Sequence, residues 1–534
     1  MRRKETSKWE FGDFQTPVDL ASAAVALLSR RGLAPATIIA PSCGVGAFLV
    51  AALRAFPRAE CVLAADINPE YLAEAGKAVA DIGEGGRCEL LHADFFRTDW
   101  RNLIASKRTP LLVLGNPPWV TSAELGSLRS ENLPEKSNFQ QLRGIEAISG
   151  KSNFDISEWM LIEYLRWLEG REGAVAVLCK TSVARKVLVH ALLGNASLSS
   201  ADMHLIDAKR HFGAAVDACL LVMTIGSQRT TNECNVFQSI EADRPLRSIG
   251  LRDGCLVSDA SAYDRHRHLR GADAAYTWRS GIKHDCSKVM ELEPDGHSFR
   301  NALGESVLLE GRYLYPMLKS SDVASETGIR YGRKYMLVTQ SAVGEDTAPI
   351  RKLAPLTWSY LERHRASLDK RASSIYRNRP RYSVFGVGDY AFAPWKLAIS
   401  GFYKSLTFKV VAPVRGRPVV FDDTVYFLPC WTAEEADFVA DLLNSEVAQA
   451  FLGSLVFWDD KRPITIEVLK KLNLRALAAE VGREVEYAGH ARRRRDLQAE
   501  SSGGQMALGV AEAPAEYATP GSKVSRRRTV VAAE

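Results

Sequence analysis

The chain has 534 residues, of which 46% are hydrophobic and 25% charged, a globular balance with material for two or more cores. No apolar run reaches the length of about 18 residues that a membrane span needs, and no apolar stretch follows the basic N-terminus as in a signal peptide. The net charge is only +6, but it is unevenly spread.

Nine cysteines are scattered through the chain without a CxxC pair. This spacing argues against a disulfide framework and a zinc site, and it favours a reducing cytosol, so we expect a cytoplasmic protein. His284, Asp285 and Cys286 form a metal-like cluster, but no second ligand pair accompanies them. We therefore interpret them as a surface or packing feature and expect no metal.

Strand-like and helix-like segments alternate over the first 226 residues. Short apolar runs predict strands at 37–40, 61–66, 88–94, 111–116, 173–180, 203–208 and 218–226. Longer runs predict helices at 47–56, 69–82, 156–169 and 181–193. Strands that are apolar throughout and joined by helices indicate a parallel sheet covered on both faces. The last two strands lie too close for a crossover helix, so we expect an antiparallel hairpin at the sheet edge.

The remainder of the chain has a different character. Residues 231–478 hold short mixed segments, such as 406–414 and 418–429, and then a helix pair at 433–457. This pattern predicts an α+β second domain after a first domain at 11–230. Residues 479–534 are polar, small and basic, and we expect them to form a disordered basic tail.

Positive charge is concentrated inside the second domain. Residues 351–410 contain twelve Lys and Arg against three Asp and Glu, together with eleven aromatic residues. The aromatic residues include Trp358, Tyr360, Tyr376, Tyr382, Tyr390, Trp395 and Tyr403. A basic segment of this kind can hold phosphates and stack on bases, or it can be a solvated face over an aromatic core. Composition alone leaves both interpretations open.

Three successive strand ends carry groups suited to a nucleoside. The turn after the first strand contains Gly44 and Gly46, which let the backbone approach a ligand closely. Asp66 ends the second strand, where a carboxylate can accept from both ribose hydroxyls. Asp94 ends the third strand and can accept from an adenine amine, with Phe95 beside the ring. Each acid alone is more often a cap or a surface charge, but together they predict nucleoside binding.

The fourth strand ends in Asn116-Pro117-Pro118-Trp119, the most informative segment of the chain. The N6 amine of adenine is a poor nucleophile, because its lone pair is delocalised into the ring. Two acceptors on its N–H bonds, the Asn116 side-chain oxygen and a main-chain carbonyl of the stiff proline pair, would draw it toward a tetrahedral geometry. Trp119 offers an indole face to a base flipped out of the duplex. The alternative is a proline-rich turn that merely ends a strand.

Residues 11–226 resemble the amino-adenine DNA methyltransferases of bacterial restriction–modification systems, and the motif order resembles the gamma class. The matching segments are Phe14-Gln15-Thr16-Pro17, the turn at 41–46 with Ser42, Cys43, Gly44 and Gly46, then Asp66, Asp94 and Phe95, then 116–119, and Asn153-Phe154-Asp155-Ile156. The resemblance implies a class I methyltransferase fold, a Rossmann-like seven-stranded α/β sheet, with S-adenosylmethionine as cofactor. It assigns Thr16, Pro17 and the turn to cofactor binding and Phe212 to a second wall for the flipped base.

Two departures from the family pattern concern the glycine turn. Ala40 stands where relatives often have an acid near the methionine part of the cofactor, and Cys43 replaces the first glycine. The leading Asn of the tetrapeptide is usual for adenine, whereas Ser in that place suggests cytosine, so we expect adenine as the substrate.

Residues 270–475 resemble the target-recognition domains of the same family. This implies double-stranded DNA as partner and a polar loop at 121–153 that closes over it. Because only a short stretch precedes Phe14, we expect a stand-alone methylase with a separate restriction endonuclease. The alternatives are methylation of RNA or of a protein glutamine, and a non-catalytic DNA-specificity subunit.

Overall fold

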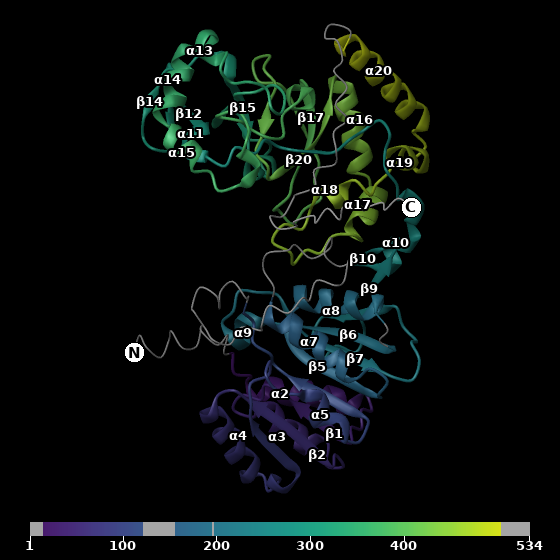
Figure 1. Cartoon of the computed structure of the whole chain (residues 1–534). Helices are drawn as coiled ribbons and strands as arrows, with labels where there is room; N and C mark the ends of the chain where they lie inside the picture. Colours follow the sequence, from purple (N-terminus) through teal and green to yellow (C-terminus); the bar gives the residue numbers. More distant parts are fainter. Residues whose placement is uncertain (1–13, 121–154, 195–196, 503–534) are drawn as a thin grey trace, which may run out of the picture.

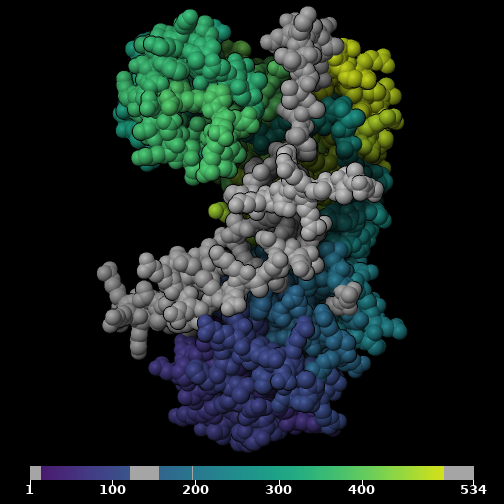
Figure 2. Space-filling view, viewed as in Figure 1, coloured from purple at the N-terminus to yellow at the C-terminus, as the bar shows by residue number. Residues whose placement is uncertain are grey.

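A computed structural model describes residues 14–120, 155–194 and 197–502. They form two bodies, a lower one that holds the N-terminal half of the described chain and an upper one that holds the rest (Figure 1). In the space-filling view, the green lobe of the upper body does not touch the purple and blue lower body (Figure 2).

The lower body is built on one ten-stranded sheet with the order β10-β9-β8-β6-β7-β5-β4-β1-β2-β3. Its strands are β1 (Thr37–Ala40), β2 (Cys61–Asp66), β3 (Cys88–His92), β4 (Leu111–Gly115), β5 (Gly173–Lys180), β6 (Leu198–Ile206), β7 (Ala218–Ile225), β8 (Glu233–Phe237), β9 (Arg247–Arg252) and β10 (Cys255–Val257). Its helices are α2 (Val18–Arg30), α3 (Ala47–Ala55), α4 (Pro69–Asp81), α5 (Trp100–Ala105), α7 (Ile156–Trp167), α8 (Thr181–Leu193) and α9 (Ala208–Phe212).

Strands β1 to β5 run parallel, and β7 runs antiparallel between β5 and β6. Successive residues of the central strands pack into opposite cores: Ile39 and Val113 lie in one cluster, and Ile38 and Leu112 in the other. A sheet covered on both faces must be apolar on both, as the sequence indicates. This α/β sheet has the class I methyltransferase strand order, with three strands added beyond β6.

The sequence prediction is wrong about the edge of this sheet. Strand β6 pairs with β7 as expected, but β8 adds to its other side in parallel, and β9 and β10 extend the sheet further. The hairpin is therefore internal, and the expected domain boundary at residue 230 falls inside the sheet. The segment 233–257 mixes apolar with charged residues, because only part of it is buried.

The upper body contains two smaller sheets. One has the order β11-β20-β17-β18 and the other β14-β13-β12-β16-β15-β19. Their strands are β11 (Arg279–Ser280), β12 (Glu291–Asp295), β13 (Ser298–Asn301), β14 (Ser306–Val307), β15 (Leu314–Leu318), β16 (Lys334–Leu337), β17 (Trp395–Ser400), β18 (Lys409–Val411), β19 (Val420–Phe421) and β20 (Val425–Cys430). Its helices are α10 (Ala260–Arg265), α11 (Ser287–Met290), α12 (Ser320–Val323), α13 (Ile350–Leu353), α14 (Pro355–Arg363), α15 (Arg365–Asp369), α16 (Ala433–Leu443), α17 (Glu446–Gly453), α18 (Ile466–Leu469), α19 (Leu474–Glu480) and α20 (Glu484–Ser502). This is the α+β mixture that the sequence predicts.

Helix α20 replaces part of the expected disordered tail. Its Arg494 is buried, donating to Glu435 Oε1 at 3.0 Å and to the carbonyl of Pro429 at 2.7 Å. Its Tyr487 hydroxyl lies 2.9 Å from Asp273 Oδ2. These contacts reach far back in the chain, so composition alone does not reveal them. The tail prediction is wrong for 484–502, and residues 503–534 lie outside the described residues.

Arg185 of the lower body forms ion pairs with the upper body. Arg185 on α8 is buried and forms ion pairs with both Asp459 and Asp460. Its guanidinium lies 4.5 Å from the centroid of the Phe457 ring, and the Thr181 hydroxyl also donates to Asp459. We call these residues the junction.

Within the described residues, no helix is both long and apolar enough to cross a membrane.

Candidate active site

The turn between β1 and α3 needs its two glycines for different reasons. Gly44 has a φ of +53°, and a methyl group there would lie 2.5 Å from Gln15 Oε1, which accepts from the Val45 N–H at 3.1 Å. Gly46 has a φ of +92°, and a methyl group there would lie 3.0 Å from Ala75 on α4. Both conformations disfavour other residues. Gly44 thus lets the turn approach Gln15, and Gly46 lets α3 approach α4.

Asp66 joins the turn to the end of β2. Its Oδ2 accepts from the Gly44 N–H at 2.8 Å and its Oδ1 from the Asn68 N–H at 2.9 Å. The carboxylate therefore fixes the turn, and it lines the pocket.

Asp94 and Phe95 follow β3 as predicted. Asp94 Oδ1 accepts from the Phe96 N–H at 2.8 Å, and its Oδ2 lies 3.6 Å from the exposed Arg97. Phe95 is 8% exposed and is held edge-on by Trp159 and Tyr164. The aromatic cluster fixes one apolar wall of the pocket beside an acceptor.

Asn116 presents an unsatisfied acceptor. Its Nδ2 donates to the carbonyl of Phe14 at 2.8 Å, and because a carbonyl only accepts, this contact fixes which amide atom is the nitrogen. Its Oδ1 is buried and has no hydrogen-bond partner within the described part of the chain. A buried acceptor without a donor is costly, so this oxygen is suited to an N–H group of a ligand.

Trp119 is more enclosed than the sequence suggests. It is 5% exposed, and its Nε1 donates to the carbonyl of Leu178 at 3.4 Å. The rings of Phe14 and Phe212 lie 5.6 Å and 5.1 Å from its ring. These three aromatic residues form one cluster beside Asn116. A base can stack on the indole only where the two phenylalanines make room.

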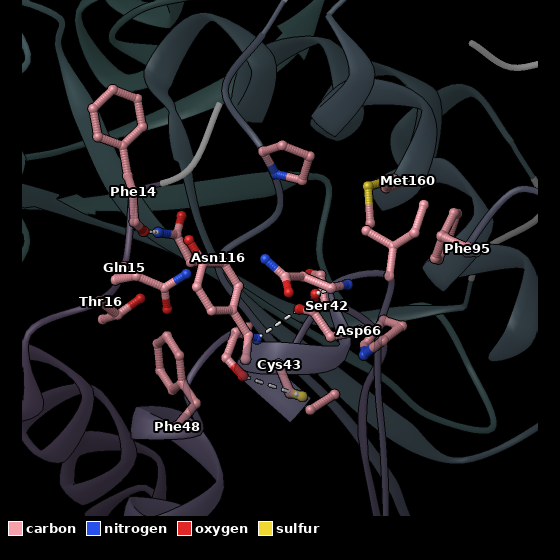
Figure 3. Close-up of a pocket in the computed structure, with 18 of the residues that line it drawn as sticks. Phe14, Gln15, Thr16, Ser42, Cys43, Phe48, Asp66, Phe95, Asn116 and Met160 are labelled. Atoms are coloured by element: carbon pink, nitrogen blue, oxygen red, sulfur yellow. Dashed lines mark hydrogen bonds between the residues drawn. The ribbon is translucent and has the colours of Figure 1, made fainter. Parts of the chain in front are cut away.

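The pocket gathers most of the predicted residues. Figure 3 shows Phe14 and Asn116 on one side, Phe95 and Met160 on the other, and Asp66 below them. The predicted residues that line it are Thr16, Ser42, Cys43, Gly44, Asp66, Asp94, Phe95, Asn116 and Pro118. Those predicted residues that do not line it are Pro17, Gly46, Pro117, Trp119 and Phe212.

Several lining residues were not singled out by sequence reasoning. They include Phe48, Tyr71, Phe96 and Met160. Each lies on a helix or loop facing a strand end, where an apolar residue gives the same pattern as ordinary core packing. Phe14 and Gln15 were signalled only by their place before Thr16, and they prove to be central.

Two features of the turn limit its chemistry. Burial and the neighbouring Asp66 raise the pKa of the Cys43 thiol to about 12, so this thiol is neutral and is not a nucleophile. Ala40 is fully buried and lines the pocket. The described lining residues include two acids, Asp66 and Asp94, and neither stands at the position of Ala40. In the described residues, no group of three His, Cys, Asp or Glu could hold a metal ion.

The basic aromatic stretch is divided between the core and the surface. Tyr360 and Tyr382 are buried in the core of the six-stranded sheet, where Trp358 packs against Tyr382. Tyr376, Tyr390 and Trp395 are half-buried, while Tyr403 is 45% exposed. The exposed cations of the stretch are Arg351, Lys352, Arg363, Arg365, Lys370, Arg377, Arg379, Arg381 and Lys404. Most of the rings build the core, and most of the charge lies on the surface.

Comparison with known proteins gives one strong sequence match. The chain is 44% identical over 474 residues to the type II methyltransferase M.NspV of Nostoc sp., which covers 89% of this chain and 98% of that protein. No protein-family model matches. Among solved structures, the type IIL restriction-modification enzyme MmeI in complex with DNA is 14% identical with a TM-score of 0.45, over 90% of this chain and 76% of that chain. A class I S-adenosylmethionine-dependent methyltransferase from Listeria monocytogenes is 13% identical with a TM-score of 0.31, over 42% and 67%.

Proposed function

We propose that this chain, which belongs to the type II methyltransferases of restriction–modification systems, methylates the N6 amine of an adenine flipped out of double-stranded DNA. The methyl donor of this class of enzyme is S-adenosylmethionine, which supplies an electrophilic methyl group. The placement of the target-reading part after the catalytic motifs supports the gamma class.

The observation that carries the proposal is the unsatisfied Oδ1 of Asn116. An exocyclic amine brings two N–H donors, and this oxygen would accept one of them. The main-chain carbonyl of Pro117 would accept the other. With both N–H bonds held, the nitrogen lone pair leaves the ring plane and can attack the methyl group. Fixed acceptors stabilise the positive charge that develops on the amine without reorganising during the reaction.

The cofactor would lie along the strand ends. Asp66, which ends β2 and lines the pocket, would accept from the ribose hydroxyls. Asp94 would accept from the adenine amine of the cofactor while Phe95 contacts its ring. The remaining residues that we assign to cofactor binding are Thr16, Pro17, Ser42, Cys43, Gly44 and Gly46, of which Pro17 and Gly46 would act by holding the backbone.

Trp119 and Phe212 would stack on the flipped base. The two rings contact each other at 5.1 Å with an interplanar angle of 67°, so a base would enter only after they separate. Phe14, which contacts both rings, would move aside or form the edge of the base pocket. This arrangement would keep the apolar surface covered until a base arrives.

The second domain, which follows β10 in the chain, would read the DNA. The exposed cations between Arg351 and Lys404 suit the phosphate backbone. A separate restriction endonuclease acting on the same site would be the biological partner, and host DNA in the cytoplasm would be the substrate.

The sharpest test replaces Asn116 with Ala. We expect methyl transfer to fall by roughly 100-fold or more, since the loss of one preorganised contact to the developing charge costs about that much. Calorimetric titration with S-adenosylhomocysteine should be unchanged. The matched control is Asn102→Ala on the exposed face of α5. Near-normal turnover by Asn116→Ala would exclude the catalytic assignment.

The substrate is tested with labelled S-adenosylmethionine and duplex DNA, RNA and protein in parallel. Label in DNA alone supports the proposal, whereas dominant label in RNA or protein overturns it. Long-read sequencing of DNA from a methylation-free host that expresses the chain then reports the modified atom and its sequence context.

A further inference from the structure

The loop after β17 exposes two consecutive aromatic side chains. Phe402 is 37% exposed and Tyr403 is 45% exposed, and Lys404 beside them is also exposed. Adjacent exposed aromatic side chains offer flat apolar surface and a hydroxyl group to a partner. A cationic neighbour on the loop suits an anionic partner.

This loop is rigidly held. The Gly401 N–H donates to the carbonyl of Thr424 at 3.0 Å, and a methyl group at Gly401 would lie 2.9 Å from the ring of Tyr426 and 3.3 Å from the carbonyl of Ile464. The guanidinium of Arg462 lies 4.7 Å from the centroid of the Phe402 ring. The side chains of Phe402 and Arg462 thus stack on each other before any ligand binds. We call this pair the Phe402–Arg462 stack.

The junction connects this stack to the catalytic edge of the sheet. Segment 457–462 runs from Phe457 and Asp459, which hold Arg185 and Thr181 of the lower body, to Arg462. In Figure 1, a yellow-green loop descends from the region of α17 and α18 toward the lower body. Thr181 directly follows β5, whose carboxyl end lies on the same edge as the active site. Trp119 donates a hydrogen bond to the carbonyl of Leu178 on the same strand. A chain of contacts therefore leads from the Phe402–Arg462 stack through the junction and β5 to Trp119.

We propose that the Phe402–Arg462 stack packs against the base pairs that open when the target adenine leaves the helix. This inference rests on the proposed function, because it assumes that a base is extruded from a duplex. Aromatic rings and guanidinium planes stack on any base, and apolar side chains stabilise DNA at unstacked steps. A stack already ordered in the free protein pays little entropy on contact. The Phe402–Arg462 stack would lower the cost of base extrusion, while Asn116 acts on the base after it has arrived.

The test compares intact and pre-opened DNA. The probe is a short duplex carrying the sequence that is methylated in the expression host, in one form with the normal pair at the target adenine and in another with an abasic site opposite it. We expect Phe402→Ala to lower kcat/KM roughly tenfold or more on the paired duplex, the range of one lost base stack. On the pre-opened duplex the variant should match the wild type. When 2-aminopurine replaces the target adenine, its fluorescence should rise as the base leaves the helix, and this rise should be smaller with Phe402→Ala than with the wild type.

Controls separate this inference from its alternatives. Leu356→Ala removes another apolar side chain of the same domain, 53% exposed, and should leave kcat/KM unchanged on both duplexes. Arg462→Gln keeps a planar group without charge and should give a smaller defect of the same kind, which also covers the case that Phe402→Ala folds poorly. Equal losses on both duplexes would overturn the inference. If the wild type methylates no DNA at all, the proposed function is wrong. The 2-aminopurine fluorescence still reports whether Phe402→Ala weakens base extrusion, so the two failures are distinguishable.

Discussion

Asp66 in the catalytic domain and Glu291 in the second domain are held in different ways. In the catalytic domain, Asp66 accepts from two backbone N–H groups and lines a pocket. In the second domain, Glu291 lies 2.7 Å and 3.2 Å from the ammonium groups of Lys319 and Lys334. An acid held by backbone amides remains available to a ligand, whereas an acid surrounded by cations is neutralised and serves the fold. The contrast predicts where binding and where stability will respond to mutation.

The largest effect is expected where the two domains meet. Arg185→Ala would leave Asp459 and Asp460, whose side chains are 20% and 45% exposed, without their cation. Hydrogen bonds to charged groups contribute about 1.5–3 kcal/mol each, and we expect a loss of that order. Urea unfolding measures the loss. The exposed pair of Arg108 with Glu60 supplies the control, because Arg108→Ala should be nearly neutral. Similar midpoints for both variants would show that the junction does not stabilise the fold.

Asp66→Asn tests the acid that faces the pocket. The change removes a charge and turns one acceptor into a donor, and hydrogen bonds to charged groups contribute about 1.5–3 kcal/mol each. We expect roughly ten- to hundredfold weaker binding of S-adenosylhomocysteine by calorimetry, together with a loss of thermal stability, because the amide nitrogen cannot accept from one of the two backbone N–H groups. Asp99→Asn, at the cap of α5, controls for a general effect of losing an acid. Unchanged affinity would contradict a ribose contact.

Glu291→Gln should show a different pattern, with lost stability and unchanged cofactor affinity. Burial would raise the pKa of Glu291, but hydrogen bonds from His284 and Lys319 outweigh it and lower the pKa to about 2. A lowered folded-state pKa adds stability that is present above the unfolded value of 4.5 and is lost as the pH falls toward 2. The variant should therefore be less stable at neutral pH, on the order of 1–2 kcal/mol. Denaturant titrations between pH 7 and about 2 should show its curve converging with that of the wild type. A constant difference across that range would exclude this linkage.

The smallest effect is expected at the rim of the pocket. Arg97 is 78% exposed and lies 3.6 Å from Asp94, and exposed pairs contribute at most about 1 kcal/mol. Arg97→Ala should change the affinity for S-adenosylhomocysteine less than about fivefold, and raised salt should remove even that change. A larger loss would mean that Arg97 itself contacts the ligand.

The meeting of Asp66, Asp94 and Asn116 in one pocket is predictable from sequence, because each follows a strand end. Asp66, Asp94 and Asn116 each follow a short apolar run, and parallel strands bring their carboxyl ends to one edge. The enclosure of Trp119 is not predictable in this way. It depends on Phe14 and Phe212, which are distant in sequence and meet only when the sheet is complete.

The second domain follows no comparable rule. Its sheets pair strands distant in sequence, such as β11 with β20, and its last helix docks through Tyr487 and Arg494 rather than through an apolar stripe. Polar residues that pair with distant partners look like solvated ones when read along the chain. The tail prediction failed on α20 for that reason.

The three strands added beyond β6 have a consequence for engineering new specificities. A chimera that exchanges recognition modules at residue 230 would discard β8, β9 and β10 and bare the backbone of β6, a ready template for aggregation. A fusion point after Val257 would transfer the recognition module whole and leave all ten strands of the catalytic domain's sheet in place. Soluble yield of the two chimeras would tell which seam the protein tolerates.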